Sequence, residues 1–337
     1  MVICGKIISG FVNLFDKGVL LMKQLRLGGT NWQSSAVALG IMRMGVLDQP
    51  AAVNALEAAH DAGITYIDSA DIYVNGKSEE VFGGALKASG LSRDDFYIQS
   101  KGGIIVDPER SHDDLVFGKR YDFSKQHLID AVDGILSRMG IDYLDSFLLH
   151  RPDPLMEPEE IADAFNTLQA AGKVRHFGVS NFNVQQFEML QEAVDQKLIF
   201  NQLQFSAAHA GMVAAGLHVN MDDKPTSNDL GMLEYARRKH VTVQAWSPFQ
   251  YGLFAGMFIN DPKYPELNAE LQKLADKYGV SKNGIAVAWI LRHPANLQVL
   301  LGTMTPAHIK DSAAGADVTL TKQEWYDVYF AAGNDLP

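Results

Sequence analysis

The sequence contains a single cysteine, Cys4, among its 337 residues. One cysteine cannot form a disulfide within the chain, which excludes the class of small secreted proteins held together by disulfides. Cationic side chains are also scarce, because 29 lysines and arginines stand against 40 aspartates and glutamates, for a net charge of −11. Nucleic acids and anionic membranes bind clustered lysine and arginine, so neither is expected as a partner. An anionic ligand would have to be held by a local site.

Motifs of several other enzyme classes are missing. The ten histidines are scattered and no H-E-x-x-H is present, so no metal site is expected. No G-x-S-x-G of α/β-hydrolases occurs, and no G-x-G-x-x-G follows the first apolar run. Residues 76–78 (Gly-Lys-Ser) resemble the end of a P-loop, but Asp71 stands where its first glycine is required. We interpret Ser78 instead as a helix N-cap, with Glu79 and Glu80 in the first turn.

Long charge-free apolar runs are absent as well. Residues 1–21 are apolar but are interrupted by Lys6, Asp16 and Lys17, and they lack the basic start and cleavage site of a signal peptide. We expect residues 1–21 to form an extension outside the folded domain, which then spans residues 22–337. A cytoplasmic location is the corresponding expectation.

What the sequence does contain is a regular alternation of short apolar, β-branched runs with longer amphipathic segments. Two of these segments, 50–62 and 124–140, have helical periodicity and end at a glycine, and Ser124 is the expected N-cap of the second. The alternation predicts an α/β fold, a single (β/α)8 TIM barrel. A hairpin of residues 23–27 and 32–35 is expected to close the bottom of the barrel. The eight runs are 36–42, 64–69, 96–101, 146–150, 175–180, 199–205, 241–246 and 297–302.

Two longer connections, residues 102–123 and 206–227, interrupt this rhythm. Each follows a predicted strand, so each is expected to lie over the C-terminal mouth of the barrel, where barrel enzymes keep their active sites. We therefore expect these two loops to shape the substrate pocket.

Ionisable side chains stand where apolar runs end. Asp68 ends the second run, Lys101 the third and His150 the fourth, while Tyr73 follows Asp68 by five positions. Neighbouring parallel strands lie about 5 Å apart, so we expect these side chains to converge on one mouth. The set suits proton donation to a carbonyl oxygen as the carbonyl receives a hydride. Tyr73 would be the acid, with its pKa lowered by Lys101. Asp68 would hold Lys101, and His150 would place the substrate oxygen.

Several motifs, in order and on the expected strands, resemble the aldo-keto reductase superfamily from about Met22 onward, and a bacterial branch of predicted oxidoreductases most of all. The resemblance implies a TIM barrel, a nicotinamide cofactor and a small carbonyl substrate, with Asp68, Tyr73, Lys101 and His150 as the catalytic tetrad. The matching segments are ITYIDSADIY (64–73), YIQSKGG (97–103), DYLDSFLLHRPDP (142–154), GKVRHFGVSNF (172–182), FNQLQFS (200–206), QAWSPFQYG (244–252) and LTKQEWYDVY (320–329).

The same resemblance implies a set of cofactor contacts. One group would bind the nicotinamide, a second would wrap the pyrophosphate, and a third would bind the adenosine end. The family often has arginine where His308 stands, and a neutral histidine holds a 2′-phosphate less firmly. NADPH is therefore expected, and NADH remains an alternative. The three groups are Ser180, Asn181, Gln202 and Trp246; Ser247, Phe249, Gly252 and Leu253; and Thr303, Thr305, His308 and Ser312.

Two further residues are weaker candidates at the mouth. Arg43 would bind a substrate carboxylate or the cofactor, or else would form a structural ion pair, and Tyr251 is a candidate wall of the substrate pocket. Two other functions remain open: a Schiff-base enzyme that uses Lys101 as a nucleophile, and a cofactor-binding redox sensor with little turnover. No heptad or apolar strip is present, so a monomer or weak dimer is expected.

Overall fold

The structure is a computed structural model that describes residues 22–107, 119–219, 227–253 and 255–337. The expected extension, residues 1–21, lies outside the described residues, as do the central parts of the two long connections. Among the described residues, no helix combines the length and the apolar character needed to cross a membrane.

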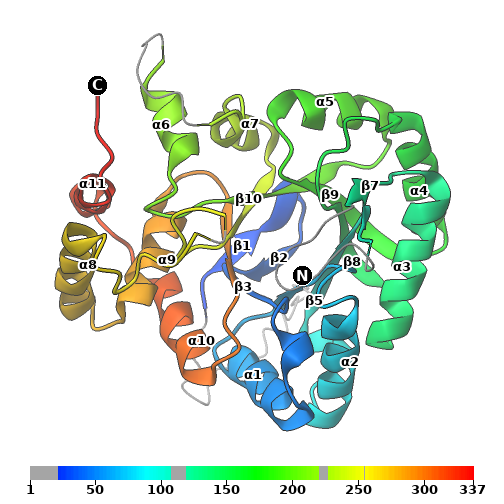
Figure 1. The fold of residues 1–337 in the computed structure, drawn as a ribbon, viewed down its shortest axis with the longest axis horizontal. Helices are drawn as coiled ribbons and strands as arrows, with labels where there is room; N and C mark the ends of the chain where they lie inside the picture. Colours follow the sequence, from blue (N-terminus) through cyan, green and yellow to red (C-terminus); the bar gives the residue numbers. More distant parts are fainter. Residues whose placement is uncertain (1–21, 108–118, 220–226, 254) are drawn as a thin grey trace, which may run out of the picture.

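Eight parallel strands form a closed barrel (Figure 1), in the order β10-β11-β12-β3-β4-β5-β8-β9. Each strand overlaps one of the predicted apolar runs, which confirms the TIM barrel. Because all eight run in the same direction, their carboxyl ends share one face, and polar residues at those ends are brought together. The strands are β3 (Val37–Gly40), β4 (Tyr66–Asp68), β5 (Tyr97–Gly102), β8 (Leu144–Leu149), β9 (Val174–Ser180), β10 (Leu198–Gln204), β11 (Thr242–Trp246) and β12 (Leu297–Leu301).

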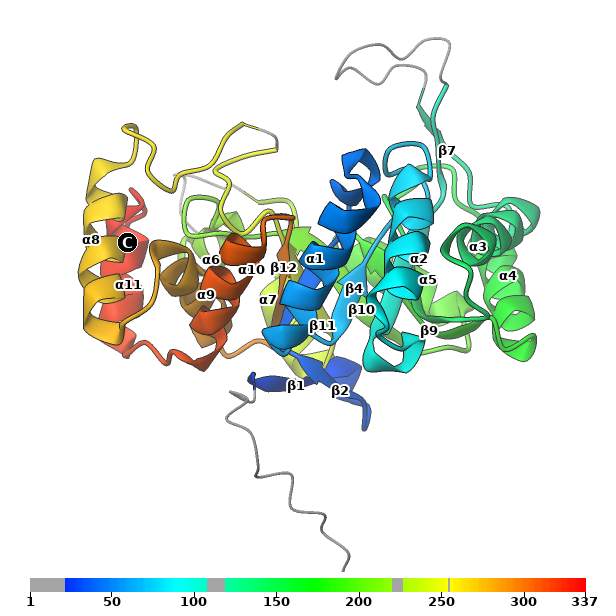
Figure 2. The ribbon, with the colours of Figure 1, turned by 90° about the horizontal axis from the view of Figure 1, so that it is seen from below.

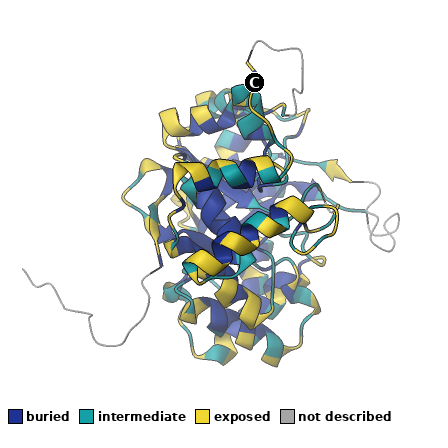
Figure 3. Cartoon of the chain, turned by 90° about the vertical axis from the view of Figure 1, so that its left-hand side faces the viewer, coloured by how far each residue is buried: buried dark blue, intermediate teal, exposed yellow. Residues whose placement is uncertain are grey.

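A ring of helices surrounds the strands. Figure 3 shows the buried faces turned inward and the exposed faces outward, as amphipathic periodicity requires. Following the barrel strands are α1 (Gln49–Asp61), α2 (Lys77–Ser89), α3 (Lys125–Met139), α4 (Pro158–Ala170), α5 (Val184–Ala193), α7 (Met232–Lys239), α9 (Lys282–Arg292) and α10 (Pro306–Ala313). The additional helices are α6 (Gly211–Leu217), α8 (Pro265–Tyr278) and α11 (Lys322–Ala331), with 3-10 turns η1 (Leu27–Gly29), η2 (Met44–Val46), η3 (Arg93–Asp95) and η4 (Ala314–Asp317).

Helix ends follow local chemistry, with one correction to the sequence interpretation. The Ser124 side chain accepts a hydrogen bond from the His127 backbone at the start of α3, and Gly140 ends that helix in a left-handed conformation. Ser78, by contrast, does not cap α2, because the N-cap is Gly76. Its hydroxyl instead donates to the Met42 carbonyl at 2.9 Å. The hydroxyl thus ties α2 to the segment after β3.

A hairpin of β1 (Gln24–Arg26) and β2 (Gln33–Ser35) lies at the end of the barrel opposite β7 (Figure 2). Its turn contains Gly28, whose φ is 55°. A Cβ on this glycine would lie 2.2 Å from the Cβ of Ile199 at the start of β10. The Gly28 backbone N–H also donates to Thr242 at the start of β11. These contacts seal the bottom of the barrel, as predicted.

The two long connections carry structure that the sequence analysis treated as loops. The first contains an antiparallel hairpin of β6 (Ile104–Ile105) and β7 (Arg120–Tyr121), which stands at the upper end of the molecule in Figure 2. The second contains α6, for which the sequence analysis made no prediction. Short elements of this kind are stabilised by packing on the barrel, and their own periodicity is too brief to detect.

Candidate active site

An ion pair lies at the carboxyl ends of β4 and β5. The Lys101 ammonium donates to both carboxylate oxygens of Asp68, at 2.7 and 2.8 Å, and to the Ser69 carbonyl at 2.5 Å. Lys101 is completely buried, and Asp68 nearly so. A buried ammonium is stable only with such a partner, because desolvation otherwise favours the neutral amine. The pairing expected from the sequence is therefore present.

Tyr73 and His150 complete the cluster. The Lys101 nitrogen lies 5.2 Å from the centre of the Tyr73 ring, and the rings of Tyr73 and His150 are 5.8 Å apart in an edge-to-face arrangement. Tyr73 reaches this position because the turn behind it is tight: residues 74–76 all have positive φ. The structure thus brings all four predicted catalytic residues to one mouth.

The electrostatics of Tyr73 differ from the sequence prediction. Desolvation raises the pKa of its hydroxyl above the ordinary value, and the Lys101 ammonium, which lowers it, compensates only in part. The expectation that the pKa falls was therefore wrong. The sequence argument counted the neighbouring charge but not the burial, which is the larger effect here. Tyr73 therefore keeps its hydroxyl proton at neutral pH.

His150 and Lys101 differ in charge at neutral pH, because His150 is neutral and Lys101 is positively charged. Burial, aided by nearby cations, keeps the pKa of His150 well below its usual range, and its buried Nδ1 has no protein partner among the described residues. Burial also lowers the pKa of Lys101, but Asp68 and Tyr73 outweigh that effect and raise it overall. The mouth therefore contains a neutral imidazole beside a permanent ammonium.

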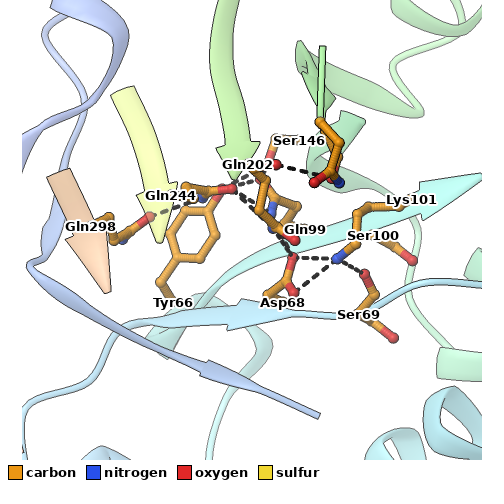
Figure 4. A network of polar contacts seen from close by, with 12 residues as sticks. Tyr66, Asp68, Ser69, Gln99, Ser100, Lys101, Ser146, Gln202, Gln244 and Gln298 are labelled. Carbon is orange, nitrogen blue, oxygen red and sulfur yellow. Dashed lines mark hydrogen bonds and ion pairs between the residues drawn. The ribbon is translucent and has the colours of Figure 1, made fainter. Parts of the chain in front are cut away.

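A chain of side-chain amides crosses the barrel interior and ends on Asp68 (Figure 4). Gln298 donates to the Ser35 carbonyl, and Gln244 donates to Gln298, both at 2.9 Å. Gln99 and Gln202 both donate to Gln244, at 2.9 and 3.2 Å, and to the Oδ1 atom of Asp68, at 2.6 and 2.9 Å. Buried amides require such partners, so this chain fixes the position of Asp68.

A second buried cluster supports the Tyr73 turn from behind. Glu79 on α2 is completely buried and accepts from Arg138 at 2.7 Å and from Ser100 at 2.8 Å. Asp71 is partly exposed as a residue, but its Oδ1 atom is buried without a partner among the described residues. Burial, with the Glu79 charge adding to it, raises the pKa of Asp71 to about 7. The mouth thus has a carboxyl that titrates near neutrality.

Three neighbouring strand ends bring the expected nicotinamide-binding residues together. The Asn181 amide donates to the Ser180 hydroxyl at 2.7 Å, and the Trp246 indole donates to Asn181 at 3.3 Å. Asn181 has a positive φ of 63° and does not cap α5, a position that Asn183 occupies. Gln202 is adjacent, but its amide donates to Asp68.

The residues expected along the rest of the cofactor lie on two segments. The first is the turn after β11, where Ser247 has a φ of 50°, the Phe249 carbonyl accepts from Phe258, and Gly252 precedes an exposed Leu253. The second is the start of α10, where Thr305 is the N-cap and Thr303 accepts from it. On α10 itself, His308 is exposed, whereas Ser312 is completely buried with no partner for its hydroxyl among the described residues.

Arg43 and Tyr251, the two weaker candidates for the substrate pocket, both contact neighbouring segments of the chain. The Arg43 guanidinium donates to the Gly302 carbonyl at 2.9 Å, which joins the segment after β3 to the end of β12. This contact is a hydrogen bond to the backbone, not the ion pair considered from the sequence. The Tyr251 ring packs 5.2 Å from that of Tyr264, with the Lys263 ammonium 5.7 Å from its centre.

Comparison with known proteins decides the family. Residues 36–329 match the model of the Aldo/keto reductase family. The chain belongs to the aldo/keto reductase family. It is 36% identical over 302 residues to the 6-dehydroglucose reductase of Agrobacterium fabrum, covering 88% of this chain and 94% of that one. It is 33% identical to the Escherichia coli oxidoreductase YdhF, covering 85% of this chain and 89% of that one.

Solved structures agree with this assignment. An aldo-keto reductase from Klebsiella pneumoniae, crystallised in complex with NADPH, has a TM-score of 0.71 at 25% identity and covers 92% of this chain and 94% of its own. The thermostable aldo-keto reductase Tm1743 has a TM-score of 0.72 at 24% identity, covering 92% of this chain and all of its own, which shows the same fold. This reductase is therefore a nicotinamide-dependent oxidoreductase.

Two sets of residues were not predicted from the sequence. One is the amide chain through Gln99, Gln244 and Gln298, whose signal was a glutamine inside each of three buried strands. The other is Arg151, which follows His150 directly and whose guanidinium carbon lies 5.7 Å from the centre of the Trp246 ring. A polar residue that interrupts a buried strand requires a partner, and that requirement could have identified the glutamines.

Proposed function

We propose that this chain reduces an aldehyde or ketone to an alcohol with NADPH, and that Tyr73 supplies the proton. The observation that carries the proposal is the arrangement of Tyr73 between a buried ammonium, Lys101, and a neutral imidazole, His150. The relatives named above support reduction of a carbonyl group, and one of them is named for an oxidised sugar.

The residues present suit a nicotinamide dinucleotide. Asn181 and Ser180 offer amide and hydroxyl groups beside Trp246, whose partly exposed ring offers an aromatic face for stacking. A Cβ on Gly252 would lie 3.1 Å from the Ala255 Cβ, a close contact that glycine avoids. When bound, the reduced nicotinamide supplies the hydride that reduces the carbonyl carbon.

The protein's own groups would then handle the substrate oxygen. The neutral His150 is able to donate a hydrogen bond to that oxygen and to orient it toward Tyr73. The Tyr73 hydroxyl donates its proton to the oxygen as negative charge develops, and the Lys101 ammonium stabilises the phenolate that remains. Asp68 keeps Lys101 charged and in place.

The choice of NADPH over NADH is also proposed. The solved relative from Klebsiella pneumoniae contains NADPH, which supports it. In this chain the candidate groups for a 2′-phosphate at the adenosine end are His308 and Lys310, both exposed, and the Lys310 ammonium lies 3.3 Å from Asp61. We therefore expect a modest preference for NADPH. Dissociation constants measured for both cofactors test this, and tighter binding of NADH would contradict it.

The two alternative functions fit the site less well. A Schiff-base lysine must become a neutral amine, yet Lys101 makes three contacts with acceptor atoms of Asp68 and Ser69 and has a raised pKa. A redox sensor without turnover needs no acid, whereas Tyr73 is placed as one. Trapping of a borohydride-stable adduct on Lys101 would support the first alternative, and cofactor binding without turnover of any aldehyde would support the second.

The decisive experiment compares wild type with Tyr73→Phe in NADPH oxidation with a reactive aromatic aldehyde. Loss of a general acid typically costs about 10²- to 10⁴-fold in rate, so we expect a loss of that size with NADPH binding retained. Tyr326→Phe, on the exposed face of α11, is the matched control and should keep the wild-type rate. Equal activity of Tyr73→Phe and wild type would mean that another group donates the proton.

A further inference from the structure

We propose that Arg151 forms an anion subsite at the mouth, so that the enzyme takes carbonyl substrates that carry a carboxylate group. The inference rests on the proposed carbonyl reduction and names the substrate class for it. With a net charge of −11, the molecule as a whole repels anions, and only a local cation could select such a substrate.

Arg151 is placed where it can reach a substrate. It follows His150 at the end of β8, is partly buried, and has its guanidinium carbon 5.7 Å from the centre of the Trp246 ring. Together with Trp246 and Asn181 it lines a cavity of about 220 Å³. The guanidinium thus lies beside the aromatic residue expected to stack on the nicotinamide, and Tyr73, the proposed proton donor, is near enough to act on it electrostatically.

The guanidinium is not neutralised by the described residues. The titratable groups that act on it electrostatically are Tyr121 and Tyr73, both uncharged hydroxyls at neutral pH. Asp229 also lines the cavity, but its carboxylate accepts from the Met232 backbone at 2.8 Å and from the Ser227 hydroxyl. A half-buried arginine without a carboxylate partner is costly unless a ligand supplies one, because its fork matches a carboxylate with two hydrogen bonds.

The surrounding field has the same sign. The charged groups that depress the pKa of the neighbouring His150 are Lys101, Arg151 and Lys119, all of them cations. Among these, Lys101 is already paired with Asp68. His209, the remaining titratable residue of the cavity lining, has a pKa lowered by burial and is neutral near pH 7. The described charged groups that act on His150 are therefore cations, in a molecule that is negative overall.

A second role for Arg151 has to be distinguished from this one. Its guanidinium interacts with the face of Trp246, and that contact alone could hold the indole in place. A purely structural arginine would affect every substrate equally, whereas an anion subsite would affect charged substrates more. The ratio of activities toward a charged and a neutral substrate of the same shape separates the two roles.

The experiment uses 4-carboxybenzaldehyde and its methyl ester, methyl 4-formylbenzoate, as a matched pair. We expect wild type to favour the carboxylate, and Arg151→Met to lower the ratio of the two kcat/KM values by about 10- to 100-fold, the value of a charge-assisted hydrogen bond. Arg151→Lys, which keeps the charge but not the fork, should lose less. Lys273→Met removes one exposed cation from α8 and should leave the ratio unchanged.

Two results with active wild type would overturn the proposal, and a third result calls for a binding measurement. Equal losses on both aldehydes in Arg151→Met would show that the side chain only supports Trp246, and weaker NADPH binding with an unchanged ratio would assign it to the cofactor. If wild type reduces neither aldehyde, the proposed function fails, and the subsite is judged by calorimetric titration of 4-carboxybenzaldehyde into the NADPH-loaded protein. Binding that weakens in Arg151→Met would support the subsite in that case, and equal binding would refute it.

Discussion

Replacing Asp71 by asparagine should change how the stability of this protein depends on pH. The pKa of Asp71 rises from 3.8 to about 7 in the folded protein. Between these values the folded state holds a proton that the unfolded state has released, so the free energy of unfolding falls as pH rises. Each pH unit costs about 1.4 kcal/mol, which gives about 4 kcal/mol over the interval. Because the residue is partly exposed, we expect between about 2 and about 4 kcal/mol.

Asp71→Asn removes the titrating group and keeps the shape of the side chain. The variant should match wild type near pH 4 and should be the more stable protein above about pH 7. Urea unfolding followed by tryptophan fluorescence, over a series of pH values, measures the difference. The matched control is Asp163→Asn, whose carboxylate is 68% exposed and lies 3.6 Å from the Lys125 ammonium. Parallel stability curves for wild type and Asp71→Asn would refute the reasoning, because they would show that Asp71 ionises normally in the folded state.

Two further predictions concern the groups around Tyr73. The pKa of His150 lies well below 6.5, so kcat/KM for reduction should not fall as the pH is lowered from about 8 to about 6. A decrease in kcat/KM on acidification, centred near pH 6.5, would show that His150 ionises there. Lys101→Met should abolish most activity and lower the free energy of unfolding at neutral pH by about 3 to 5 kcal/mol, since it leaves the Asp68 charge buried without its ammonium. Thermal and urea unfolding test this, and an unchanged stability would mean that the glutamine donors alone hold the charge.

The barrel and the positions of the four catalytic candidates followed from the sequence because both depend on strong periodic patterns. The predicted runs 146–150 and 297–302 overlap the buried strands β8 and β12, and a polar residue that ends such a run, as His150 does, lies at the mouth for geometric reasons alone. The helix that begins after Ser124 was also clear, since its cap, apolar stripe and terminal glycine agree. Where local signals agreed in this way, the prediction was confirmed.

The rest depends on contacts between distant segments. Ser78 has the chemistry of a cap, but the chain enters α2 through the left-handed Gly76, so its hydroxyl bonds to Met42 instead. The direction in which the Tyr73 pKa shifts depends on the desolvation of its hydroxyl. The sequence spacing between Asp68 and Tyr73 gives no information about that desolvation. The sequence shows that Arg151 is a cation at the end of a strand. It does not show that Trp246 lies beside it, because two strands of the barrel separate β8 from β11.

The amide chain that ends on Asp68 has a fixed polarity. The Ser35 carbonyl and the Asp68 carboxylate, its two ends, are both acceptors, so each glutamine must present its nitrogen in a prescribed direction. No single amide can flip without setting a buried donor against a donor or a buried acceptor against an acceptor. We therefore expect a mutation at Gln298, near the floor, to affect the Lys101–Asp68 ion pair through reoriented glutamine side chains. For an engineer who wishes to alter this core, the glutamines form one unit that has to be redesigned together.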